Sequence, residues 1–172
     1  MSQQLPRYLI LTLLFVGTQS FAAEEGQQAK LRDLDAFWVE VSRSVKEGDF
    51  EGYAATCHPR GVLVSEAKQT SYPLEKALAG WKQGFDDTKA GKMKAGVEFR
   101  FSHRIGDETT AHETGIFRYA TVDDTGKETP ALIHFAALLV KEKGRWLVLM
   151  EHQKTEATEK EWDTLESSKQ AK

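Results

Sequence analysis

The sequence has little cysteine and proline and no excess of basic over acidic residues, and each of these features excludes a class of protein. One cysteine in 172 residues, Cys57, excludes an intrachain disulfide framework and any zinc cluster built from cysteines. Four prolines and thirteen glycines exclude a collagen-like or proline-rich architecture. A net charge of −3 lacks the bulk basicity that nucleic-acid binding needs, so no nucleic-acid partner is expected. What remains is an ordinary globular balance, with 40% hydrophobic and 28% charged residues.

The first 22 residues have the order of a secretory signal. Arg7 precedes the apolar run 8–16, and Ser20 and Ala22 fit the −3 and −1 positions of a cleavage site after Ala22. A membrane anchor is the alternative, but the run is shorter than the ~20 residues that span a bilayer. We therefore expect an exported protein, periplasmic or secreted, with no membrane contact after the signal is removed. In such a compartment the unpaired Cys57 is tolerated mainly when it is buried.

Hydrophobic periodicity predicts helices first and strands afterwards. Apolar residues three and four apart predict a long helix from Leu31 that ends at Gly48, and a second helix over 50–57 that buries Cys57. A third helix is expected after Ser71. Alternation over 97–105 predicts a strand, and the turns that follow at 106–107, 123–126 and 141–144 divide the rest into three more, near 110–122, 130–140 and 145–154. Helices followed by a meander of strands define an α+β fold.

The same reading divides the chain into four parts. They are a signal peptide at 1–22, a polar leader at 23–30, one domain at 31–155 and a polar C-terminal tail at 156–172. Within the domain, the run 131–140 is apolar on both faces, which predicts a central strand covered on both sides. Helices can cover only one face, and a large bare apolar face is rare on a monomer. We therefore expect a homodimer that packs through the outer face of the sheet.

Three motifs resemble the SnoaL-like, nuclear-transport-factor-like superfamily. They are GDFEGY at 48–53, HPRGVLV at 58–64 and the final strand GRWLVLMEH at 144–152. The resemblance covers about 31–155 and implies a cone-shaped, curved mixed β-sheet wrapped around N-terminal α-helices, with a pocket inside and dimers through the outer face. The superfamily includes ketosteroid isomerase, polyketide cyclases, dehydratases and the association domain of a calmodulin-dependent kinase. The fold alone therefore does not decide function.

The resemblance also allows a test for isomerase chemistry. It places the carboxylate base of that family at Ser65 and its tyrosine donor at Val41, so both catalytic residues are absent. Glu66 would replace the base only after a slip of strand register, which would also turn its neighbours to the wrong face. Ketosteroid isomerase activity is therefore not expected.

Polar residues interrupt the apolar alternation of the four predicted strands. One stands on each strand: His103, Glu113, His134 and His152. If all four face the cone they converge in an apolar pocket, which is the usual sign of a ligand site, and Glu113 beside His152 or His134 would make an acid–base pair. Alternatively each histidine is satisfied separately, at the dimer face or at a strand end, because a one-residue slip inverts a face.

Aromatic residues would line the same pocket. The candidate ligand-binding side chains are Trp38, Tyr53, Phe99, Phe101, Phe117 and Tyr119, together with His103 and His134. No His-x-His or His-Glu-x-x-His spacing supports a metal site, and no phosphate loop or dinucleotide fingerprint indicates a cofactor, so neither is expected.

The sequence thus predicts an exported protein that binds a small, partly apolar ligand. Two alternatives stay open. One is an isomerase, cyclase or dehydratase that uses Glu113 and His152 as an acid–base pair. The other is a non-catalytic dimeric assembly module.

Overall fold

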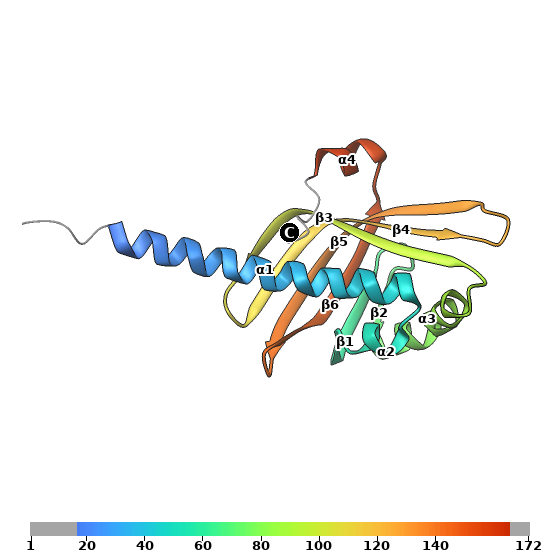
Figure 1. Ribbon diagram of the computed structural model, residues 1–172, viewed down its shortest axis with the longest axis horizontal. Helices are drawn as coiled ribbons and strands as arrows, with labels where there is room; N and C mark the ends of the chain where they lie inside the picture. Colours follow the sequence, from blue (N-terminus) through green and yellow to red (C-terminus); the bar gives the residue numbers. More distant parts are fainter. Residues whose placement is uncertain (1–16, 166–172) are drawn as a thin grey trace, which may run out of the picture.

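A six-stranded mixed sheet curls around the N-terminal helix (Figure 1). The computed structural model describes residues 17–165, so most of the expected signal peptide and the end of the expected tail lie outside the described residues. Its elements are α1 Gly17–Glu47, α2 Phe50–Ala54, β1 Cys57–Ser65, β2 Thr70–Pro73, α3 Leu74–Lys89, β3 Lys94–Gly106, β4 Thr110–Val122, β5 Glu128–Glu142, β6 Arg145–Glu156 and α4 Glu159–Thr164. The strand order is β2-β1-β6-β5-β4-β3, and only β1 and β6 are parallel neighbours. The expected α+β cone is confirmed.

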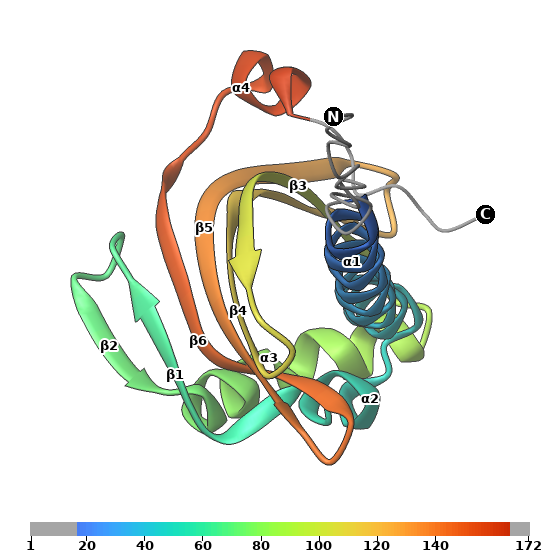
Figure 2. The same ribbon diagram turned by 90° about the vertical axis from the view of Figure 1, so that its left-hand side faces the viewer.

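Figure 2 shows α1 on the concave side of the curled sheet, and Figure 1 shows α2 and α3 near the C-terminal end of α1. The residues that α1 buries recur at helical spacing and include Leu34, Trp38 and Val41, as the sequence predicts. The start of α1 differs from the prediction, because the helix already includes the residues expected to form a polar leader at 23–30. Its first turns project beyond the sheet in Figure 1.

The chain turns sharply between α1 and α2. Gly48 has a φ of +65°, and a Cβ at this position would collide with the backbone of Lys89 at the end of α3. The second helix is shorter than predicted: it ends at Ala54, and Cys57 begins β1 instead of lying in a helix. The reason is tertiary, because Cys57 pairs with Val148 of β6 and extends the sheet.

The long strands follow the predicted alternation. β4 has the predicted bounds, and β5 lies between β4 and β6, where a strand that is apolar on both faces belongs. In β5 the odd-numbered residues Ile133, Phe135 and Ala137 face the concave side of the sheet, and the even-numbered ones face the outer side. The short edge strand β2 has no counterpart in the prediction.

Helix α4 covers part of the outer face of the sheet. Its Trp162 is buried against Ile116 and Leu132, and the Arg100 guanidinium lies 4.3 Å from the centre of the Trp162 ring. Part of the expected polar tail therefore packs onto the sheet. It covers some of the apolar surface that was expected to require a second copy of the chain.

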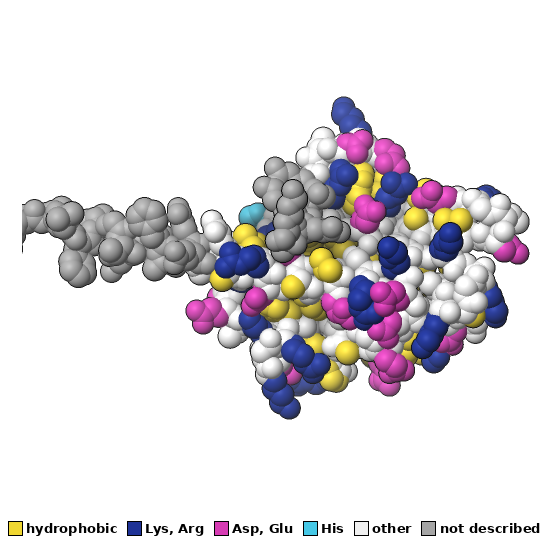
Figure 3. Space-filling model, viewed as in Figure 1, with side chains coloured by type: hydrophobic (Ala, Val, Ile, Leu, Met, Phe, Trp, Pro, Cys, Tyr) yellow, Lys and Arg dark blue, Asp and Glu magenta, His cyan; other side chains and the backbone are white. Residues whose placement is uncertain are grey.

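The surface around α1 carries mixed charge. Figure 3 shows acidic and basic side chains interspersed on this face, so it offers no broad basic patch of the kind that follows a phosphate backbone. Among the helices within residues 17–165, none is both long and apolar enough to cross a membrane.

Candidate functional site

A cavity of about 480 Å³ lies between α1, α3 and the concave face of the sheet. Its aromatic lining consists of Trp38, Tyr53, Trp81, Phe85, Phe99, Phe117, Tyr119 and Phe135. Its polar lining consists of Thr56, Cys57, Thr88, Glu151 and Gln153. A mostly apolar space of this size with a few polar groups is typical of a small-molecule site.

Two glycines of α3 keep this space open. Gly80 and Gly84 stand one helical turn apart and both line the cavity. A Cβ added to either would have no atom within 4 Å, so neither glycine is required by close packing. Glycine inside a helix costs about 0.5–1 kcal/mol relative to alanine. The helix therefore gives up stability at two positions where a side chain has room to occupy the cavity.

Glu151 is the one charged residue of the lining. Its Oε1 accepts a hydrogen bond from Gln153 Nε2 at 2.7 Å, and no lysine, arginine or histidine of the described part of the chain lines the cavity. The side chain is half-buried because it faces the cavity, and the desolvation that comes with burial raises the pKa of its carboxyl group. Glu151 is thus a carboxyl group without a cationic partner in an apolar chamber.

The groups around Glu151 are weak acids that stay protonated near neutral pH. Burial raises the pKa of Tyr53 well above its usual value, and the negative charge of Glu151 raises it further. Burial, followed by the same charge, raises the pKa of the Cys57 thiol to about 12. Burial also raises the pKa of Tyr119. Cys57 is therefore a poor nucleophile here, since the thiolate is the reactive form.

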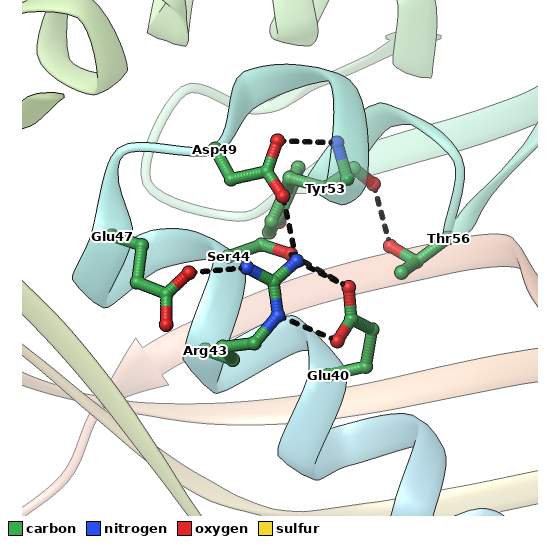
Figure 4. Close-up of polar contacts among 8 residues, drawn as sticks. Glu40, Arg43, Ser44, Glu47, Asp49, Tyr53 and Thr56 are labelled. Carbon is green, nitrogen blue, oxygen red and sulfur yellow. Dashed lines mark hydrogen bonds and ion pairs between the residues drawn. The ribbon is translucent and has the colours of Figure 1, made fainter.

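The corner between α1 and α2 holds Tyr53 in place (Figure 4). The Arg43 guanidinium bonds to three carboxylates: Glu40, Glu47 and Asp49, with shortest N···O distances of 2.6, 2.5 and 2.6 Å. Arg43 lowers the pKa of Asp49, whose other oxygen accepts the Gly52 N–H at 2.9 Å at the start of α2. The Tyr53 carbonyl then accepts the Thr56 hydroxyl at 2.6 Å. This network fixes the backbone that carries the tyrosine into the cavity.

Glu113 is completely buried on the concave face but does not line the cavity. Its Oε2 accepts the Trp38 indole N–H at 2.6 Å, and its Oε1 is ion-paired with Nε of Arg104. Arg104 also reaches Asp35 of α1, at 2.6 Å. Glu113 is therefore a structural carboxylate that supports the cavity wall through Trp38.

The three strand histidines all lie on the outer side of the sheet. His134 Nε2 is 3.4 Å from a Glu161 carboxylate oxygen of α4, His152 Nε2 is 3.0 Å from Glu66, and His103 is exposed. The expectation that Glu113, His134 and His152 meet in one cavity is thereby corrected. The histidines are satisfied separately, which was the alternative arrangement.

Two β-bulges account for part of this difference. In β3, Phe101 pairs with Gly115 of β4 and His103 pairs with Thr114, so Ser102 is an extra residue between these two pairs. The alternation shifts after it, and Arg104 lies on the concave face. In β6, Leu149 is an extra residue between the two pairs that Val148 and Met150 form with β5. Val148, Glu151 and Gln153 consequently line the cavity, and His152 turns outward to Glu66.

The predicted aromatic lining is placed as follows. The residues that line the cavity are Trp38, Tyr53, Phe99, Phe117 and Tyr119. Phe101 lies outside the lining and packs against Trp38 and Phe135, with ring centres 5.7 and 6.0 Å away. Sequence reasoning missed Glu151, Gln153, Gly80 and Gly84. Within the part of the chain that the structure describes, no three His, Cys, Asp or Glu side chains are arranged to hold a metal ion.

The fold is the one seen in nuclear-transport-factor-2-like proteins. Residues 30–157 match the family described as calcium/calmodulin dependent protein kinase II association domain, and the chain belongs to that family. No curated protein sequence matches the chain.

Solved structures share the fold at low sequence identity. A protein of unknown function from Mycobacterium tuberculosis has 14% identity and a TM-score of 0.60, over 78% of this chain and 75% of that one. A ketosteroid isomerase-like protein from Erwinia carotovora has 16% identity and a TM-score of 0.55, over 75% and 97%. The association domain of C. elegans CaMKII has 16% identity and a TM-score of 0.51, over 80% and 100%.

The Glu113 network predicts a large loss of stability when its arginine is removed. Arg104→Met leaves a fully buried carboxylate without its ion-pair partner, so the free energy of unfolding should fall by about 3–5 kcal/mol in urea denaturation. Arg118→Met is the matched control: Arg118 pairs with the exposed Glu128 at 3.4 Å and should cost about 0–1 kcal/mol. Equal losses in the two variants would contradict a structural role for the buried pair.

The raised pKa of Glu151 predicts a pH-dependent gain in stability for Glu151→Gln. A carboxyl group whose pKa is higher in the folded state stabilises the fold fully below its unfolded pKa, and this contribution is lost as pH rises through the folded pKa. The variant does not ionise, so thermal unfolding should show it equal to the parent in acid and more stable at neutral pH. A variant that loses stability at neutral pH would show that the ionised carboxylate is held by favourable contacts instead.

Proposed function

We propose that the protein is exported and binds a small, partly apolar molecule in the cavity between α1, α3 and the sheet. The observation that carries the proposal is the uncompensated carboxyl group of Glu151 within aromatic walls. A carboxyl group placed there lowers the stability of the fold at neutral pH, whereas an apolar residue of similar size would not. A ligand that binds the carboxyl group of Glu151 would explain why this residue occupies the cavity.

The glycines of α3 support the same proposal. Gly80 and Gly84 are open positions on the wall of the cavity, where alanine or leucine would be a better helix former than glycine. Among the described residues, open internal space and a carboxyl group without a cationic partner therefore coincide in one cavity. Natural sequences give up stability in this way mainly at functional sites.

Export rests on the N-terminal sequence. Arg7, the apolar run 8–16 and the small residues Ser20 and Ala22 form the signal pattern. Cleavage after Ala22 would leave most of α1 in the mature protein, including the buried residues Leu34, Phe37, Trp38, Val41 and Val45.

Filling the cavity tests the binding proposal. Gly84→Leu should raise the free energy of unfolding by about 0.5–1 kcal/mol, because it replaces a helical glycine, and should abolish binding. The measurement is titration with Nile red, a neutral apolar dye that fluoresces in apolar surroundings. Ala79→Leu, an equally large side chain on the exposed face of α3, is the control and should keep the dye site. Equal dye binding by Gly84→Leu and the parent, or no dye binding by the parent, would overturn the proposal.

A second candidate function is assembly of several copies through the outer face of the sheet. The family description as an association domain favours it. So does the sheet itself, because Leu138, Val140 and Met150 form a half-buried apolar strip on the outer face, whereas Trp162 packs against Ile116 and Leu132. An apolar sheet face of this kind suits an isologous contact with a second copy.

Sedimentation equilibrium tests the assembly. The parent should have the mass of a dimer or a larger oligomer, and Leu138→Glu, which places a charge in the strip, should be monomeric and still bind Nile red. Lys160→Glu, on the exposed side of α4, should leave the mass unchanged. A parent that stays monomeric at high concentration would contradict this candidate.

A further inference from the structure

The charges and hydrogen-bonding groups of the cavity define which ligand it would accept. Among the residues that the structure describes, Glu151 is the only charged residue of the lining, and no basic side chain lines the cavity to hold an anion. A carboxylate or phosphate ligand would have to enter an apolar chamber beside a like charge, which is unfavourable. The electrostatics therefore favour a cation.

The free hydrogen-bonding capacity points the same way. Gln153 donates its amide N–H to Glu151, which leaves the amide oxygen of Gln153 and Oε2 of Glu151 as acceptors. Tyr53 and Tyr119 also line the cavity, and each carries a hydroxyl group. A tyrosine oxygen also accepts a hydrogen bond. A ligand that brings several N–H donors complements this set.

The walls add a third contribution. A cation within about 6 Å of the face of a tryptophan, tyrosine or phenylalanine ring is attracted to it, and the attraction strengthens when water is excluded. Eight aromatic residues line the cavity, among them Trp38, Trp81 and Tyr53. The same rings also accommodate the apolar body of a ligand.

We infer that the cavity binds an organic amine, with its ammonium group against Glu151 and Gln153 and its apolar body among the aromatic rings. This inference rests on the proposed function, since it names the chemical class of the ligand for the same site. Neither the family description nor the similar structures assign such a ligand to this chain.

Three indole compounds that differ only in the end group of the side chain test the inference. Tryptamine carries an ammonium, tryptophol a hydroxyl and indole-3-propionate a carboxylate, and each is titrated into the full protein by calorimetry. Tryptamine should bind about tenfold or more tightly than tryptophol, because a hydrogen bond to a charged group contributes about 1.5–3 kcal/mol. Indole-3-propionate should bind most weakly.

Two variants with the same change of charge locate the effect. Glu151→Gln should remove the preference for tryptamine and leave the affinity for tryptophol unchanged. Glu98→Gln, an exposed position on the outer face of the sheet, should keep the preference. Equal or tighter binding of tryptophol to the parent, or a preference that survives in Glu151→Gln, would overturn the inference.

The dye separates failure of the inference from failure of the proposed function. If Nile red binds the parent but not Gly84→Leu, while tryptamine shows no advantage, the cavity is a ligand site and the amine class is wrong. If neither the dye nor any indole binds, both the site and the amine class are rejected.

Discussion

The buried carboxylate of Glu113 fastens helix α1 to the concave face of the sheet. It accepts the indole N–H of Trp38 from the helix and is ion-paired with Arg104 of β3, which in turn reaches Asp35 on α1. A carboxylate this deep in a fold is tolerated only with such partners. With its N–H held, the Trp38 ring lies 4.4 Å from that of Phe99, and the cavity begins on this wall. The position of α1, and with it the shape of the site, depends on this contact.

Element order was predictable because hydrophobic period is a local property of the sequence. The bounds of β4 and the interior position of β5 follow from alternation and from an uninterrupted apolar run. The face of the sheet that a residue occupies could not be predicted in the same way. Alternation divides the residues of a strand between two faces but does not show which face is concave. His134 shares its face with Ala136 and Leu138, and both faces of β5 are apolar, so the pattern gives no sign of direction. Contacts with α1 and α4 decide it.

Bulges are the second reason why the site was only partly predictable. A single extra residue in a strand reverses which face each later residue of that strand occupies. Arg104 therefore lies on the concave face with Glu113, and His103 lies on the outer face. In β6 the same device lets Val148 and Glu151 both face the cavity and turns His152 outward. The local sequence carries signals that point to Glu151 and to α3 nonetheless. One is a glutamate followed two residues later by a glutamine in an apolar strand, and the other is a pair of glycines four apart in an amphipathic helix.

Glu113 and Glu151 both lie on the concave face of the sheet, but they differ in how far neighbouring groups offset the cost of burying a carboxyl group. Glu113 has an arginine, an indole N–H and no access to the cavity, so its charge is fully used inside the protein. Glu151 has a glutamine amide, faces open space and has its pKa raised by burial. An apolar residue would suit either position, since each lies on the concave face of a strand among aromatic rings. Glu113 has an ion pair and a hydrogen bond from neighbouring side chains, so its role is structural. Glu151 receives only a glutamine N–H, and Gly80 and Gly84 leave open space on the wall of the same cavity. The proposed ligand site rests on this combination.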